Sequence, residues 1–188
     1  MDNRALIQAT ALTLFAARGY DAVGVQEIVS AANVTKPTLY HYFGNKVGLL
    51  QSIVQQYGSP LDERMADAAD YQGDLPLTLN RVVKAHFQSA RGQPDYYRLF
   101  LSLWFAPPAS EAAGVVAERF RLQRLRLETL FEAAARDHGN MRGRQQAYAI
   151  TFLGMISSYI SLFLHGQAEL DDDLAFRAVQ QFMHGIYS

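Results

Sequence analysis

Apolar residues recur at a helical spacing along almost the whole chain. Within residues 24–46, one apolar face of a first short helix carries Val25, Ile28, Val29 and Ala32. Residues 33–34 break this pattern, and a second helix of about two turns follows, which Leu39 and Phe43 can hold to a core. Thr35 is a good N-cap for the second helix, and Pro37 falls in its first turn, where the missing N–H costs nothing. The pattern predicts two short helices joined by a tight turn.

The outward face of the second helix is unusual for so short an element. It carries a lysine, a threonine, two tyrosines and a histidine, namely Lys36, Thr38, Tyr40, His41 and Tyr42. These side chains suit a groove lined with phosphates and base edges. The layout is that of a helix-turn-helix in which the second helix reads DNA. The alternative is an ordinary helical hairpin whose aromatic residues are half-buried packing.

The flanking segments extend this motif into a small helical head. A first helix is expected from about Asn3 to Arg18, with an apolar stripe made of Ile7, Ala11, Leu14 and Phe15. After the motif, Asn45 can cap a further helix, and Lys46 then lies in its first turn, where its charge and the backbone N–H groups suit a phosphate. Gly58-Ser59-Pro60 predicts a kink or break, because proline loses a hydrogen bond inside a helix. We therefore predict a DNA-binding domain over residues 1–57 and a second domain over residues 58–188.

The rest of the chain also has a helical pattern. Breaks containing glycine or proline separate segments near 77–91, 95–105, 110–137, 142–165 and 172–187. None of them alternates with a period of two, so no sheet is expected. The predicted fold is all-α, with about nine helices in a three-helix head and a helical body.

Charge and composition narrow the function classes. The 188 residues carry a formal net charge of −1 and no cysteine, which excludes disulfides and thiolate chemistry and fits a reducing cytoplasm. Residues 1–50 are only about +1, so any DNA contact rests on a few placed groups or on two copies acting together. The N-terminus lacks the pattern of a signal peptide, and no apolar run is expected to span a bilayer, although residues 149–164 come closest. The expected location is the cytoplasm, at the nucleoid when the protein is bound to DNA.

Enzyme signatures are missing from the sequence. It has no glycine-rich phosphate loop, no nucleophile elbow and no pair of histidines four residues apart. We therefore expect no catalytic residue, no metal site and no cofactor. The four arginines between positions 119 and 126 are interpreted as a solvated, partly ion-paired surface.

The N-terminal third closely resembles the tetracycline-repressor (TetR) family of transcriptional regulators. The resemblance is specific over residues 4–54 and architectural beyond them. It is carried by Phe15, Gly19-Tyr20, Val25, Ile28, Ala31-Ala32, the run 34–43, Asn45-Lys46 and Leu49-Leu50.

The resemblance implies DNA contacts in and beside the second motif helix. Four residues that open this helix would approach bases or nearby phosphates, namely Thr35, Lys36, Pro37 and Thr38. Tyr40 and His41 would reach the groove, and Tyr42 and Lys46 the phosphates. Gly24 departs from the family, which usually has Ser or Thr there, and it brings no hydroxyl for a phosphate.

The resemblance also implies a small-molecule inducer, bound between the helices of the body. The expected cavity lining is aromatic, with Trp104, Phe105, Phe120, Tyr148 and Phe152, while polar groups would come from His86, Tyr148 and Tyr159. Such a lining predicts a mostly apolar or aromatic ligand. The alternative is that these aromatic residues simply fill the helical bundle.

Finally, the resemblance implies that the last two helices pair with those of a second copy. The expected interface residues are Ile150, Leu153, Ser157, Ile160, Ser161, Leu164, Phe176, Val179, Phe182 and Met183. A two-fold homodimer would match a palindromic operator. The implied function is a ligand-responsive repressor that releases operator DNA, and the rival is a helical scaffold protein whose head contacts protein.

Overall fold

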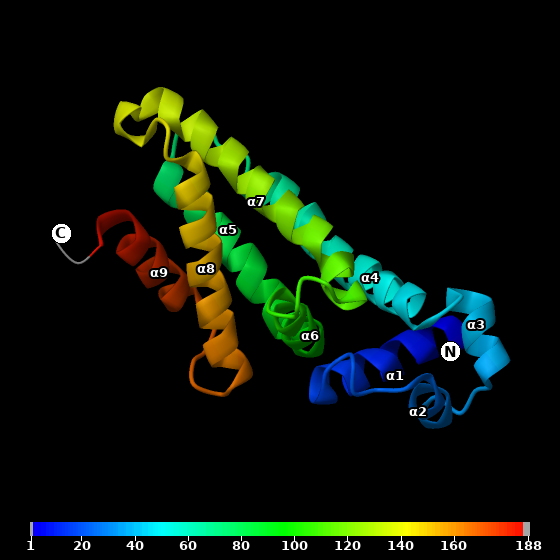
Figure 1. Ribbon diagram of the computed structural model, residues 1–188. Coiled ribbons are helices and arrows are strands. Elements are labelled where there is room, and N and C mark those ends of the chain that lie inside the picture. The colour runs from blue at the N-terminus through cyan, green and yellow to red at the C-terminus, as the bar shows by residue number, and fades with distance from the viewer. Residues whose placement is uncertain (1, 186–188) are drawn as a thin grey trace. The chain divides into compact units, whose positions relative to one another are not determined.

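The computed structural model describes residues 2–185, and within this range the chain is helical and contains no strand (Figure 1). The elements are α1 (Asn3–Arg18), α2 (Val25–Ala31), α3 (Lys36–Phe43), α4 (Lys46–Ala68), α5 (Leu75–Gly92), α6 (Pro94–Trp104), α7 (Glu111–Asp137), a 3-10 turn η1 (Gly139–Met141), α8 (Gln145–Leu164) and α9 (Asp172–His184). The predicted all-α fold is confirmed. The end of the predicted segment 172–187 lies outside the described residues.

Packing divides the chain into two compact units. The first unit contains Met1–Ser59 and Gln93–Glu118, and the second contains Pro60–Gly92 and Arg119–Ser188. The helix-turn-helix therefore shares its unit with α6, which packs on α1. The functional division at residue 57 stays a prediction.

The first unit is held by the apolar faces that the sequence indicates. Ile7, Ala11 and Phe15 of α1 are buried, as are these apolar residues of the next three helices: Ile28, Val29, Leu39, Phe43, Leu49, Leu50 and Ile53. A side-chain hydrogen bond from Gln8 to Ser52 ties α1 to α4. Burying such faces supplies most of the stability of helices this short.

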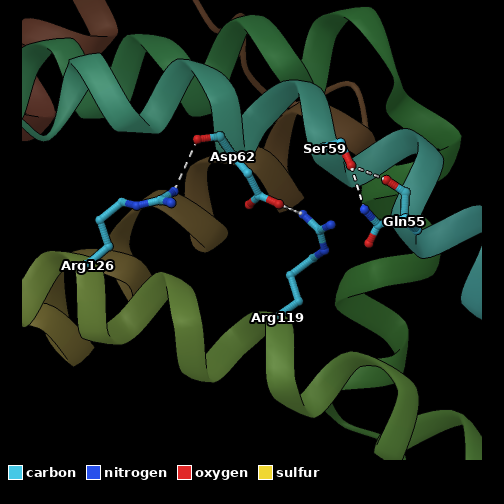
Figure 2. A network of polar contacts seen from close by, with 5 residues as sticks. All are labelled: Gln55, Ser59, Asp62, Arg119 and Arg126. Atoms are coloured by element: carbon cyan, nitrogen blue, oxygen red, sulfur yellow. Dashed lines mark hydrogen bonds and ion pairs between the residues drawn. The ribbon is translucent and has the colours of Figure 1, made fainter.

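Helix α4 does not break at Gly58-Ser59-Pro60, so the break, one of the two outcomes predicted there, is wrong. The helix continues from Lys46 to Ala68 with Pro60 inside it. Ser59 Oγ donates a hydrogen bond of 2.6 Å to the carbonyl oxygen of Gln55 (Figure 2), and Leu61 and Met65 are buried beyond the proline. Apolar burial on both sides of Pro60 thus outweighs the single backbone hydrogen bond that a proline removes.

In the second unit, α5 packs against α8 and α9 around an apolar core. Phe152 is fully buried, and its ring centroid lies 4.8 Å from that of Phe182 and 6.2 Å from that of Phe131. These rings connect α7, α8 and α9. Most of their surface is used for packing.

Two arginines of α7 hold the part of α4 that belongs to this unit (Figure 2). Arg119 Nη1 lies 2.6 Å from Asp62 Oδ2, and Arg126 Nη1 donates a hydrogen bond of 3.3 Å to the carbonyl oxygen of Asp62. The Arg119 side chain is only 10% exposed, so its interpretation as a solvated surface group is wrong. The interpretation holds for Arg124, which forms a 3.0 Å ion pair with Glu128.

His86 on α5 is a deeply buried histidine, with 3% of its surface exposed. Burial, and after it the positive charge of Arg126, lowers the pKa of the imidazole from 6.5 to about 4. Between pH 6.5 and about 4, the imidazole is therefore neutral in the folded protein, whereas the same group in an unfolded chain would bind a proton.

Mild acid is expected to destabilise the protein through His86. Between pH 6.5 and about 4 the unfolded chain binds a proton that the folded chain does not. The free energy of unfolding should therefore fall by about 1.4 kcal/mol per pH unit as pH decreases through this window. Urea unfolding near neutral pH and at about pH 5 should show a loss in wild type that exceeds the loss in His86→Gln by about 2 kcal/mol. Equal losses in both proteins would contradict this role.

Candidate nucleic-acid interface

The turn between α2 and α3 is built by Asn33, which takes the left-handed backbone conformation with φ of +51°. Asparagine tolerates this region better than most side chains. The Val34 N–H then donates a hydrogen bond of 3.0 Å to the carbonyl oxygen of Val29, which closes the end of α2. A short, fixed reversal results, as a helix-turn-helix requires.

Helix α3 starts at the cap that the sequence predicts. Thr35 Oγ1 accepts a hydrogen bond of 3.4 Å from the Thr38 N–H, and the two threonine hydroxyl oxygens lie 2.8 Å apart. Pro37 occupies the first turn. Both hydroxyls are therefore held beside the first turn of the helix.

The two faces of α3 separate as expected. Leu39 is fully buried and Phe43 is 9% exposed, whereas Tyr40 is 46% and Tyr42 is 36% exposed. The exposed set also includes Thr35, Lys36, Pro37 and His41, while Thr38 is half-buried. The His41 and Tyr42 ring centroids lie 5.3 Å apart in an edge-to-face arrangement. Two exposed tyrosines argue against an ordinary hairpin with half-buried aromatic packing.

Lys46, the eighth predicted DNA contact, opens α4 and is half-buried. Its Nζ lies 4.0 Å from the ring centroid of Tyr20 and 5.8 Å from that of Phe15. Burial lowers the pKa of the ammonium group, and the nearby carboxylate of Asp21 partly opposes this shift. Lys46 is thus placed by contacts within the first unit.

The junction between α3 and α4 depends on Gly48, which sequence reasoning missed. Asn45 Oδ1 accepts a hydrogen bond of 2.7 Å from the Gly48 N–H and caps α4, as predicted for Asn45. A Cβ atom added at Gly48 would overlap the carbonyl oxygen of Phe43. Only glycine lets the first turn of α4 pass so close to the end of α3. The available signal was a glycine in the first turn of a helix, where it is otherwise unfavourable.

Helix α2 is capped by Gly24, the position where this chain lacks the Ser or Thr that is usual in the family. The Gly24 carbonyl oxygen accepts bonds of 3.1 Å and 3.2 Å from the N–H groups of Glu27 and Ile28, so the helix forms without a capping hydroxyl. Arg18 forms an ion pair with Glu27 and joins the end of α1 to α2. One positive charge of the head is therefore already paired.

The predicted ligand residues are divided between the two units. Trp104 and Phe105 belong to the first unit and are 52% and 83% exposed. In the second unit, His86 and Phe152 are buried, and the half-buried residues are Phe120, Tyr148 and Tyr159. The Tyr148 ring packs 5.5 Å from Phe131, and the Tyr159 ring 6.5 Å from Phe87. Core packing thus accounts for part of this set, and the aromatic ligand cavity stays a prediction.

The predicted dimer residues include a large exposed apolar surface. Ile150 is 54%, Phe176 55% and Met183 36% exposed. The half-buried members of the set are Leu153, Ser157, Ser161, Leu164 and Phe182, and the buried members are Ile160 and Val179. A hollow of about 300 Å³ between α5 and α9 is lined in part by Leu77, Phe176 and Val179.

Helix α8 is more apolar than the sequence interpretation allowed. By length and composition alone, this 20-residue helix could cross a membrane. Its most apolar 18-residue stretch has a mean hydropathy of 1.7, and 22% of that stretch is buried. The expectation that no apolar run has such a length is wrong, because the mean hydropathy stays at 1.7 despite Ser157, Ser158 and Ser161. Core helices of soluble proteins meet the same two criteria.

The family model described as "Bacterial regulatory proteins, tetR family" matches residues 7–53, which hold most of α1, the helix-turn-helix and the start of α4. The chain belongs to the TetR family. The match covers the whole helix-turn-helix, and a DNA-reading role for the exposed face of α3 stays a prediction.

Similar proteins extend the match over most of this TetR-family chain. The HTH-type transcriptional activator FasR of Mycolicibacterium smegmatis is 25% identical over 184 residues, covering 98% of this chain and 82% of FasR. The transcriptional regulator FadR from Bacillus subtilis, solved with stearoyl-CoA, has a TM-score of 0.80 at 21% identity and covers 97% and 99% of the two chains. AibR, solved with isovaleryl coenzyme A and operator DNA, has a TM-score of 0.75 at 23% identity, with coverages of 96% and 97%. The two structures share the fold, and the relatives are transcriptional regulators.

Proposed function

We propose that this TetR-family regulator is a homodimeric, ligand-responsive repressor. Two copies would bind a palindromic operator through their α3 helices and release it when an inducer binds the helical body. The observation that carries the proposal is the exposed face of α3, where Lys36, Tyr40, His41 and Tyr42 point away from a core anchored by Leu39 and Phe43. The rival scaffold function gives no reason for this combination of groups.

The inducer is proposed to be a small, mostly apolar or aromatic molecule. The acyl-CoA ligands of FadR and AibR give one class to test first, because each joins an apolar chain to a polar head. A ligand acts only through different affinities for the DNA-bound and released states. A series of acyl-CoA and aromatic compounds that never shifts the melting temperature or operator binding would contradict an inducer of this kind.

Repression is the proposed direction of control. FasR, which is similar over almost the full chain, is an activator, so the sign of the response needs its own measurement. A reporter gene placed behind the operator should be expressed more strongly when the regulator is deleted. Lower expression in the deletion strain would show activation instead.

The DNA-contacting residues should separate into two kinds. Lys36 and His41 on the exposed face of α3 are expected to read bases, so Lys36→Ala and His41→Ala should change sequence preference, by about 1–3 kcal/mol at the base pair concerned. Lys46 is expected to meet a phosphate, so Lys46→Gln should weaken operator and random DNA alike. Titrations of each variant against both DNAs measure the difference. Equal effects of all three substitutions on specific and random DNA would refute these roles.

A further inference from the structure

Lys46 rests on a pair of aromatic rings in the first unit. The Phe15 and Tyr20 ring centroids lie 5.1 Å apart with a tilt of 55°, and both rings are buried, at 1% and 7% exposure. The Lys46 ammonium lies closer to Tyr20, 4.0 Å from its ring centroid. The rings cannot move without disturbing the core, so they form a fixed platform at the start of α4.

An aromatic platform holds a cation differently from a carboxylate. The ring face attracts the ammonium through its quadrupole but carries no net charge, so the positive charge of Lys46 is not neutralised. The side chain is only half-buried, which leaves part of the ammonium open to a further partner. A phosphate can therefore approach the Lys46 ammonium without first displacing the group that holds it, because that group is a neutral ring and not a carboxylate.

We infer that Tyr20 is a positioning residue for DNA binding: its ring holds the Lys46 ammonium at the start of α4, ready for a backbone phosphate. This inference rests on the proposed DNA-binding function. A free lysine side chain samples many rotamers and loses that freedom on binding. Lys46 is already restricted by the ring, so a phosphate contact demands less further ordering.

The Tyr20 hydroxyl stays protonated, which keeps the platform neutral. Burial, and after it the carboxylates of Glu111 and Asp21, raises the pKa of this phenol to about 12. No phenolate forms near neutral pH to pair with Lys46. A phenylalanine ring at position 20 would offer the same face.

The inference is tested by the salt dependence of operator binding in Tyr20→Leu, Tyr20→Phe, Lys46→Gln and the Tyr20→Leu/Lys46→Gln double variant. Losing the Lys46–phosphate contact in both protomers should lower the slope of log affinity against log salt by about 2. Tyr20→Leu should lower this slope and weaken binding roughly two- to fivefold per protomer, and the double variant should be no worse than Lys46→Gln. Tyr20→Phe should keep the wild-type slope. An unchanged slope in Tyr20→Leu, tighter binding, or additive losses in the double variant would overturn the inference.

A measurement on the wild type does not depend on how well Tyr20→Leu folds. The Lys46 Hε protons should show an upfield NMR shift from the Tyr20 ring, and this shift should persist when operator DNA is added. Loss of the shift on DNA binding would show that the ring releases Lys46, and would overturn the inference. If wild type itself shows no salt-dependent binding to DNA, the proposed function fails and not merely the role of Tyr20.

Discussion

Gly48→Ala is expected to abolish operator binding. The added Cβ would overlap the carbonyl oxygen of Phe43, so either α3 or the start of α4 must shift. Backbone has no rotamer with which to relieve such an overlap, and we expect a loss of about 3 kcal/mol in stability. The shift would fall at the end of α3, the proposed DNA-reading helix, and at Lys46, so operator affinity should drop more than tenfold even in molecules that stay folded. Thermal melting and DNA titration of the variant measure both effects.

Gly114→Ala is the matched control for this substitution. Gly114 also lies in a helix of the first unit, but among the described residues a Cβ added there would meet no atom within 4 Å. Alanine at this position should be neutral or stabilise by about 0.5–1 kcal/mol, because glycine is the weaker helix former. If both alanine variants bind operator like wild type, the close approach at Gly48 does not matter for the reading helix.

Phe176→Glu is expected to split the protein into monomers. Phe176 is 55% exposed on α9 and belongs to the proposed interface, where a carboxylate would be buried without a partner in the dimer. Leaving a charge buried in this way costs about 2–5 kcal/mol. Operator affinity should fall roughly a hundredfold or more, because the two heads would no longer bind as a linked pair. Light scattering at micromolar concentration and DNA titration together report the loss.

Leu122→Glu provides the control for surface charge. Leu122 on α7 is 51% exposed, nearly as much as Phe176, but it lies outside the proposed interface. The variant should remain dimeric and bind operator like wild type. A wild-type protein that is monomeric, or a Phe176→Glu variant that remains dimeric, would contradict the proposed interface.

The head was predictable because its signals are local. The caps at Thr35 and Asn45 and the buried faces of the first four helices follow from residues three or four apart in the sequence. Each signal can be read without knowing what packs against the helix. The exposed face of α3 follows in the same way, since it is what remains once Leu39 and Phe43 are buried.

The features that sequence reasoning missed depend on partners far along the chain or on backbone geometry. The Arg119 side chain is largely shielded from solvent and pairs with Asp62, which lies 57 residues earlier in the chain. Helix α4 runs through Pro60 because Leu61 and Met65 are buried beyond it. Gly48 matters only because the carbonyl oxygen of Phe43 lies so close to it. The exposure of Trp104 and Phe105 likewise reflects tertiary packing, and no helical periodicity could reveal it.

The protein is proposed to bind operator DNA as a dimer, with few positive charges in each head. The decisive experiment is a titration of the protein against its operator and against random DNA of equal length at increasing salt. We predict dimeric binding that prefers the operator, with an affinity for both DNAs that falls steeply as salt rises, because phosphate contacts release counterions. Binding that is insensitive to salt, or that does not distinguish operator from random DNA, would contradict the claim and favour a head that contacts protein.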